Sequence, residues 1–116
     1  MIVSENFVLR AGFRTWLDND PEISVVAEVG IGTRAIAELE KWQPDVVVVD
    51  HNPPHIDTVV FLEQVRAARL SARIVVVSDV TEYHSVHRVM DAGAAGYLGK
   101  SVPLTMLITA IKAVAT

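Results

Sequence analysis

A single aspartate ends the most apolar run of the chain. Residues 46–49 are four consecutive valines, Asp50 follows them directly, and Pro53 and Pro54 break the backbone soon afterwards. A carboxylate at the end of a buried run can act as a nucleophile or bind a cation. Three further apolar runs also end in polar residues, namely Ser4 and Glu5, Ser78 and Asp79, and Gly99 and Lys100. The groups able to do chemistry therefore gather where apolar runs end.

The apolar runs alternate with segments of helical spacing. The expected strands are residues 2–3, 23–29, 46–49, 74–77 and 97–98. Apolar residues between them recur three and four positions apart, for example at Leu9, Phe13 and Trp16. Five strands alternating with five helices predict an α/β fold built on a parallel sheet. The valine-rich runs do not alternate with polar residues, as expected of central strands covered by helices on both faces.

This fold would bring the polar strand ends together at one edge of the sheet. Ligands of open parallel sheets lie beyond the carboxyl ends of the strands, where the strand order reverses. In the common order 2-1-3-4-5, Glu5 and Asp50 are expected to face each other across a crevice, with Ser78 and Lys100 on its far side. The alternative is that the strands simply end in polar solvent. That explains any one position easily, but it explains the convergence of four such groups poorly.

Composition limits the class of protein. The 116 residues are enough for one domain, and 51% hydrophobic with 21% charged residues indicate a globular chain. The absence of cysteine excludes disulfides and thiolate metal sites and fits a reducing cytoplasm. A net charge of −4 without a basic stripe argues against direct contact with nucleic acid. No apolar run reaches the length of a membrane span, so we expect a cytoplasmic domain without membrane contact.

Four stretches together carry a resemblance to a known family. QPDVVVVDHNPPHID, ARIVVVSD and DAGAAGYLGKSVP contain the polar strand ends, and RAGFRTWLDNDPEISVVAEVGIGTRAI precedes them. Over nearly its whole length the chain resembles the receiver domain of two-component response regulators of the NarL/LuxR type. The resemblance implies a flavodoxin-like, CheY-like fold with strand order 2-1-3-4-5 and five flanking helices. It also implies a signalling switch that controls a transcription-regulatory output, without enzymatic activity of its own.

The resemblance assigns roles to the residues at the sheet edge. Asp50 would accept a phosphoryl group from a histidine kinase, Ser78 would hydrogen-bond a phosphoryl oxygen, and Lys100 would neutralise the acyl phosphate. Tyr97 would be the aromatic switch that moves when the Ser78 hydroxyl moves. These roles make physical sense because phosphoryl transfer needs in-line positioning and positive charge near the transferred oxygens.

The same resemblance implies a Mg²⁺ cofactor, and the sequence departs from the family there. The expected ligands are Glu5, Asp50 and the backbone carbonyl of Asn52, with Pro54 holding the loop. The family places two acidic residues at the end of the first strand, whereas this chain has Ser4 and Glu5. Mg²⁺ demands near-ideal octahedral geometry, so the lost carboxylate and the longer one should both weaken the site.

Two functions remain open from the sequence. The first is a receiver phosphorylated on Asp50, which the retained Ser78 and Lys100 favour. The second is an atypical, phosphorylation-independent receiver that serves as a dimerisation or ligand-binding module, which the Ser4–Glu5 pair favours. A hydrolase using Asp50 as its nucleophile is set aside for want of a general base at suitable spacing. Relatives of the NarL type continue into a helix-turn-helix domain, so we expect either an excised receiver, residues 1–116, or a stand-alone regulator.

The sequence also predicts which residues lie on the surface of the domain and which lie in its core. We expect a weak homodimer through the first and fifth helices, or through the fourth helix, fifth strand and fifth helix. The reason is the apolar content of the last helix outside its buried stripe, where Met106 and Val114 lie. The histidines are assigned to the surface or the switch face rather than to a metal site. Trp16 and Trp42 occupy apolar helical positions and are assigned to the core.

Overall fold

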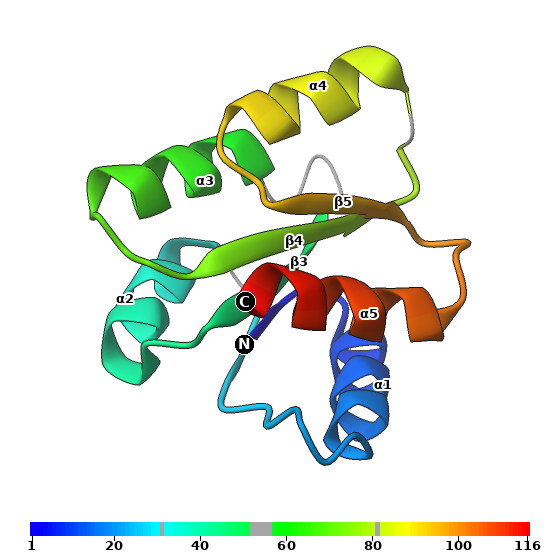
Figure 1. Cartoon of the computed structure of the whole chain (residues 1–116). Helices are drawn as coiled ribbons and strands as arrows, with labels where there is room; N and C mark the ends of the chain where they lie inside the picture. Colours follow the sequence, from blue (N-terminus) through cyan, green and yellow to red (C-terminus); the bar gives the residue numbers. More distant parts are fainter. Residues whose placement is uncertain (31, 52–56, 81) are drawn as a thin grey trace.

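Parallel strands at the centre of the molecule form a five-stranded sheet in the order β2-β1-β3-β4-β5 (Figure 1). The computed structural model describes residues 1–30, 32–51, 57–80 and 82–116. The strands are β1 (Ile2–Val3), β2 (Glu28–Val29), β3 (Val46–His51), β4 (Arg73–Ser78) and β5 (Gly96–Gly99). The helices are α1 (Phe7–Asp18), α2 (Gly32–Trp42), α3 (Thr58–Ala67), α4 (Tyr83–Asp91) and α5 (Leu104–Ala115). The predicted fold class and strand order are confirmed.

The sheet divides the core into two layers. Helices α2, α3 and α4 pack on one face, and α1 and α5 cover the other (Figure 1). Alternate valines of β3 serve the two layers: Val47 and Val49 join the first, and Val48 joins the second. All three are nearly inaccessible to solvent. The valine run is therefore apolar throughout because each face of the strand is buried under helices.

The strand predicted over residues 23–29 is wrong in length. Only Glu28 and Val29 pair with β1, through the partners Ile2 and Val3. Because β1 is only two residues long, it has no further strand residues with which a longer β2 could form hydrogen bonds. Ile23 and Val25 still pack at the edge of the α1/α5 layer, so their apolar character serves burial without strand pairing.

Of the two tryptophans assigned to the core, Trp42 departs from that assignment and Trp16 does not. Trp16 is half-buried against the α1/α5 layer. Trp42 is 45% exposed, which makes the core assignment wrong for this residue. Its indole Nε1 donates to the Glu38 carboxylate at 2.8 Å, and the Lys41 ammonium lies over its ring. An amphipathic ring at the end of a helix can satisfy its polar group in this way without entering the core.

Candidate functional site

Asp50 lies at the carboxyl end of β3 and is only 2% exposed. It stands between the ends of two neighbouring strands. On one side β1 pairs with β3 through Val3 and Val49, and on the other Val77 of β4 is the register partner of Asp50. A buried carboxylate is costly unless charged or hydrogen-bonding groups surround it. The residues at these strand ends supply them.

Ser4 provides the first partner of the Asp50 carboxylate. Its hydroxyl donates to Asp50 Oδ2 at 2.8 Å, and its oxygen accepts from the backbone amide of Asn6 at 3.0 Å. Ser4 is fully buried, whereas the neighbouring Glu5 is exposed. The contact expected across the crevice from Glu5 is thus made by Ser4, because the chain turns outward directly after β1.

Lys100 provides the second partner. Its ammonium nitrogen lies 2.6 Å from Asp50 Oδ1, and its side chain is 22% exposed. Oδ1 receives no hydrogen bond of ordinary geometry from the residues described, so this contact is ionic rather than directional. The backbone amide of Lys100 donates to the Ser78 carbonyl at 2.9 Å, which fixes the residue beside the end of β4. The sequence placed Lys100 on the far side of the crevice from Glu5 and Asp50, and the structure shows that its ammonium reaches Asp50.

Ser78 and Tyr97 meet at a third residue rather than at Asp50. The Ser78 hydroxyl oxygen accepts from the backbone amide of Val80 at 2.9 Å. The Tyr97 hydroxyl donates to the carbonyl of the same Val80. Ser78 is fully buried, and Tyr97 is half-buried against the layer of α2, α3 and α4. Both predicted switch residues therefore bind the backbone of Val80, in the segment that follows β4. No sequence signal marked Val80.

His51 holds the other side of the site. Its Nδ1 lies 2.6 Å from the hydroxyl oxygen of Thr58, the first residue of α3. Burial lowers the pKa of the His51 imidazole, and the Lys100 ammonium acts in the same direction, whereas Asp50 and Asp57 raise it. The sequence assigned His51 to the surface or the switch face and did not mark Thr58, which is 1% exposed. A histidine directly after a buried strand was the signal available.

Arg10 supports the end of β1 from helix α1. Its Nη1 donates to the Ser4 carbonyl at 2.7 Å, and its Nε lies 3.7 Å from the Glu28 carboxylate. The guanidinium thus ties α1 to the end of β1 and to the edge strand β2. This support keeps the Ser4 hydroxyl turned toward Asp50.

The described residues do not fit a tightly held Mg²⁺. Receiver domains generally bind Mg²⁺ at an acidic pocket, but here a neutral hydroxyl contacts one oxygen of Asp50 and an ammonium contacts the other. No group of three or more His, Cys, Asp or Glu side chains positioned to hold a metal occurs within residues 1–30, 32–51, 57–80 and 82–116. Asn52 and Pro54, which the resemblance assigns to the metal loop, lie outside the described residues.

Comparison with known proteins agrees with this geometry. The family model of the response regulator receiver domain matches residues 1–112. The nitrate/nitrite response regulator protein NarP of Escherichia coli (strain K12) is 34% identical over 113 residues, which make up 97% of this chain and 53% of NarP. The transcriptional regulatory protein DegU of Brevibacillus brevis is 31% identical over 115 residues, 99% of this chain and 49% of DegU. The chain thus spans about half the length of these curated relatives.

Solved structures give the same result. The crystal structure of a two-component response regulator of the LuxR family from Aurantimonas sp. SI85-9A1 superposes with a TM-score of 0.92 at 28% identity, covering 99% of this chain and 82% of that one. Within the part of the chain that is described, no helix has the length and apolar content needed to cross a bilayer. The sheet order, the buried aspartate with its lysine and the family match lead to one conclusion: this chain belongs to the response regulator receiver domain family and is similar to its NarL-type members.

Proposed function

We propose that Asp50 accepts a phosphoryl group from a histidine kinase and that Lys100, Ser78 and Tyr97 respond to it. The observation that carries this proposal is the Lys100 ammonium 2.6 Å from Asp50 Oδ1. It places a cation where an acyl phosphate would develop negative charge. Phosphorylation on aspartate is typical of the family.

The chemistry can be written with the residues present. An oxygen of the Asp50 carboxylate attacks phosphorus, the bond between phosphorus and the kinase histidine nitrogen breaks, and an acyl phosphate forms. The Lys100 ammonium then pairs with the new phosphoryl oxygens in place of the carboxylate. Ser78 accepts a hydrogen bond from Val80, so its own O–H proton can donate to a phosphoryl oxygen. Any such movement of Ser78 reaches Tyr97 through Val80, because both side chains bond that residue.

The output belongs to the same proposal. NarP and DegU are named as regulatory proteins, and each is about twice as long as the matched region. We propose that this domain likewise controls a transcription-regulatory partner domain in the cytoplasm, acting as a switch without enzymatic turnover of its own. Weak homodimerisation over helix α5 is part of this proposal.

A second candidate function is an atypical receiver that works without phosphorylation. The specific observation in its favour is that Ser4 and Lys100 already satisfy the Asp50 carboxylate without a metal. We propose that any Mg²⁺ site formed by Glu5, Asp50 and Asn52 is weak. Losing one carboxylate near a dication removes roughly 1 kcal/mol of attraction in water and several times more in a partly buried cleft. Each 1.4 kcal/mol is about tenfold in affinity.

One experiment separates the two candidates. The wild type, Asp50→Asn and Ser4→Asp are incubated with acetyl phosphate and Mg²⁺, and the products are resolved on a phosphate-affinity gel. We expect slow labelling of the wild type, none of Asp50→Asn, and faster labelling of Ser4→Asp. Mg²⁺ titrations followed by amide shifts near Asp50 should show tighter binding to Ser4→Asp. A wild type that remains unlabelled at every Mg²⁺ concentration favours the atypical receiver, and one as reactive as Ser4→Asp refutes the weakened site.

A further inference from the structure

A cavity of about 770 Å³ opens between α1 and the segment that joins β5 to α5. It lies on the α1/α5 face of the sheet, beside the site, and it shares Lys100 with that site. Small-molecule sites in proteins commonly enclose roughly 300–1,000 Å³ and combine apolar walls with a few polar groups. The cavity has that size, and of the four residues in the proposed phosphoryl chemistry only Lys100 lines it.

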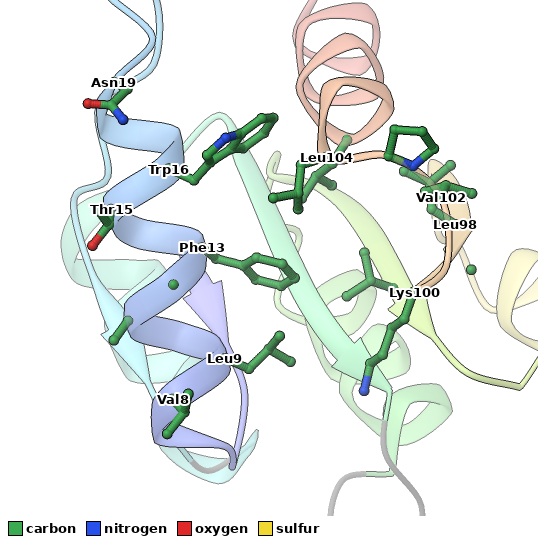
Figure 2. A pocket seen from close by; sticks show the side chains of 16 residues that line it. Val8, Leu9, Phe13, Thr15, Trp16, Asn19, Leu98, Lys100, Val102 and Leu104 are labelled. Carbon is green, nitrogen blue, oxygen red and sulfur yellow. The ribbon is translucent and has the colours of Figure 1, made fainter.

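The walls of the cavity are mainly apolar, and most of them come from α1 and from the segment that runs from β5 into α5. Figure 2 shows Leu9, Phe13 and Trp16 of α1 on one side, facing Val102 and Leu104 on the other. These side chains supply two aromatic rings and several aliphatic groups, which suit a ligand containing rings.

The width of the cavity depends on small residues of α1. Ala11 and Gly12 line it in the middle of the helix. A Cβ added to Gly12 would meet nothing within 4 Å, so a larger side chain could enter the open space without a clash. Glycine in a helix interior costs stability relative to alanine. Here a larger side chain would occupy part of the open space beside the helix.

A single charged side chain reaches the cavity. Of the sixteen lining residues, all within the described part of the chain, only Lys100 is charged. Its ammonium extends toward the end of β3 (Figure 2), where Asp50 contacts it. An ammonium has three N–H donors. The contact with Asp50 leaves donors for a second anion, and the Lys100 side chain, which is 22% exposed, lines the cavity.

From these observations we infer that the cavity binds an apolar, ring-containing small molecule that carries one anionic group. The rings lie between Phe13, Trp16 and Leu104, and the carboxylate or sulfonate pairs with Lys100 at the inner end. This complementarity of charge favours a small anion over a second copy of the chain, which would have to bring an acidic side chain to the same place. The inference does not depend on phosphorylation of Asp50.

A consequence follows for the neighbouring site. The ligand anion and the Asp50 carboxylate share one ammonium, so each weakens the hold of Lys100 on the other. Removing the charge of Asp50 should therefore strengthen binding of an anionic ligand and leave a neutral one unchanged. Asp50→Asn is nearly isosteric and can still accept the Ser4 hydroxyl bond, so the fold should persist.

The test uses two fluorescent probes that differ in one group. Anilinonaphthalene sulfonate is the anion, and phenylnaphthylamine is its neutral counterpart. Both are titrated into a Trp42→Phe background, in which Trp16 is the remaining tryptophan of the two, without Mg²⁺ or a phosphoryl donor. We expect saturable binding, with energy transfer from Trp16 to the bound probe. Lys100→Met should weaken the anionic probe about fivefold and change the neutral one less than about twofold. Asp50→Asn should tighten the anionic probe alone.

Matched variants decide whether the probe occupies this cavity. Gly12→Leu fills it and should abolish energy transfer, whereas Glu63→Leu, also on an exposed helix position but outside the cavity lining, should not. Near-ultraviolet circular dichroism confirms that each variant is folded. Equal binding to Gly12→Leu and to the wild type would overturn the inference, as would equal effects of Lys100→Met on both probes. Probe release as protein concentration rises would assign the cavity to a second copy and overturn it as well.

Discussion

Ser4, Asp50 and Lys100 form a compact set at the residue scale. A carboxylate buried as deeply as Asp50 costs several kcal/mol unless its charge is compensated. The Lys100 ammonium compensates the charge, and the Ser4 hydroxyl satisfies the other oxygen. In the family pattern, a second acidic residue at the Ser4 position would add repulsion that only a cation could relieve. We propose that the serine lets the site rest without a metal, at the expense of metal affinity.

Ser4→Ala should destabilise the protein by about 1–3 kcal/mol, because Asp50 Oδ2 loses its buried donor and the Asn6 amide loses its acceptor. Urea unfolding monitored by circular dichroism measures this. Ser71→Ala, at an exposed position, is the matched control and should change the free energy of unfolding by less than about 0.5 kcal/mol. Equal effects of the two substitutions would show that the Ser4–Asp50 bond contributes little to stability.

His51 predicts a pH dependence of stability. Burial lowers its pKa in the folded state below the ordinary value of 6.5, so the unfolded chain binds a proton more readily. Its contribution to stability is complete above about pH 6.5 and is lost as the pH falls below that value. Urea midpoints between about pH 7.5 and about pH 5.5 should fall more for the wild type than for His51→Gln. A slope for His51→Gln equal to that of the wild type would contradict the assignment.

At the scale of elements, two helices begin directly behind the loops that surround the site. The Asn6 side chain caps α1 by accepting from the Leu9 amide, and Asp57 caps α3 by accepting from the Val60 amide. These caps fix where each helix starts and so where the preceding loop must end. Helix α1 is tied further by Arg10, which bonds the Ser4 carbonyl. The site is thus positioned by helix starts as much as by strand ends.

Asn6→Ala should lower the free energy of unfolding by about 1 kcal/mol because the first turn of α1 loses its capping acceptor. Asn19→Ala is the matched control at the other end of the helix, where the backbone of Asn19 makes the capping bonds. Urea unfolding of both variants gives the comparison. Amide exchange of residues 7–10 should also increase in Asn6→Ala alone, and unchanged exchange there would mean that the cap does not set the helix start.

The sequence predicts the positions of some helices and strands well, and it leaves the bounds of others open. The runs at 46–49 and 74–77 could be placed as central strands because burial on both faces demands unbroken apolar residues. The strand at 23–29 could not be bounded, because its length depends on how many residues of β1 are available to pair. Asp50 and Lys100 were expected to converge. The Ser4–Asp50 bond depends on the turn after β1, and the cavity depends on the spacing of α1 and α5, neither of which has a local pattern.

At the scale of the whole molecule, the two faces of the sheet differ in what they leave uncovered. The face of α1 and α5 carries the cavity and exposes Val8, 77% accessible, and Met106, 48% accessible. On the other face, α4 exposes Met90 at 40%. Val114, expected among the exposed residues of the last helix, instead packs at the edge of the α1/α5 layer. Exposed apolar side chains on several helices favour binding to another protein surface. Helix α5 belongs to both of the expected dimer surfaces.

We predict weak self-association that involves α5. In a sedimentation velocity series the wild type should sediment faster as its concentration rises. Met106→Glu should weaken association by at least about tenfold, because it would bury an unpaired carboxylate in either arrangement. Each copy carries a net charge of −4, so added salt should screen the repulsion and strengthen association of the wild type.

Two further variants decide which surface is used. Val8→Glu disrupts an interface built on α1 and α5, whereas Met90→Glu disrupts one built on α4, β5 and α5. Each change places a charge at an exposed position outside the core, so the fold of the monomer should be unaffected and each variant controls for the other. The variant that restores monomeric sedimentation identifies the interface. A wild type that stays strictly monomeric at high concentration, with and without a phosphoryl mimic, would refute self-association and leave the apolar residues of α5 for a different partner.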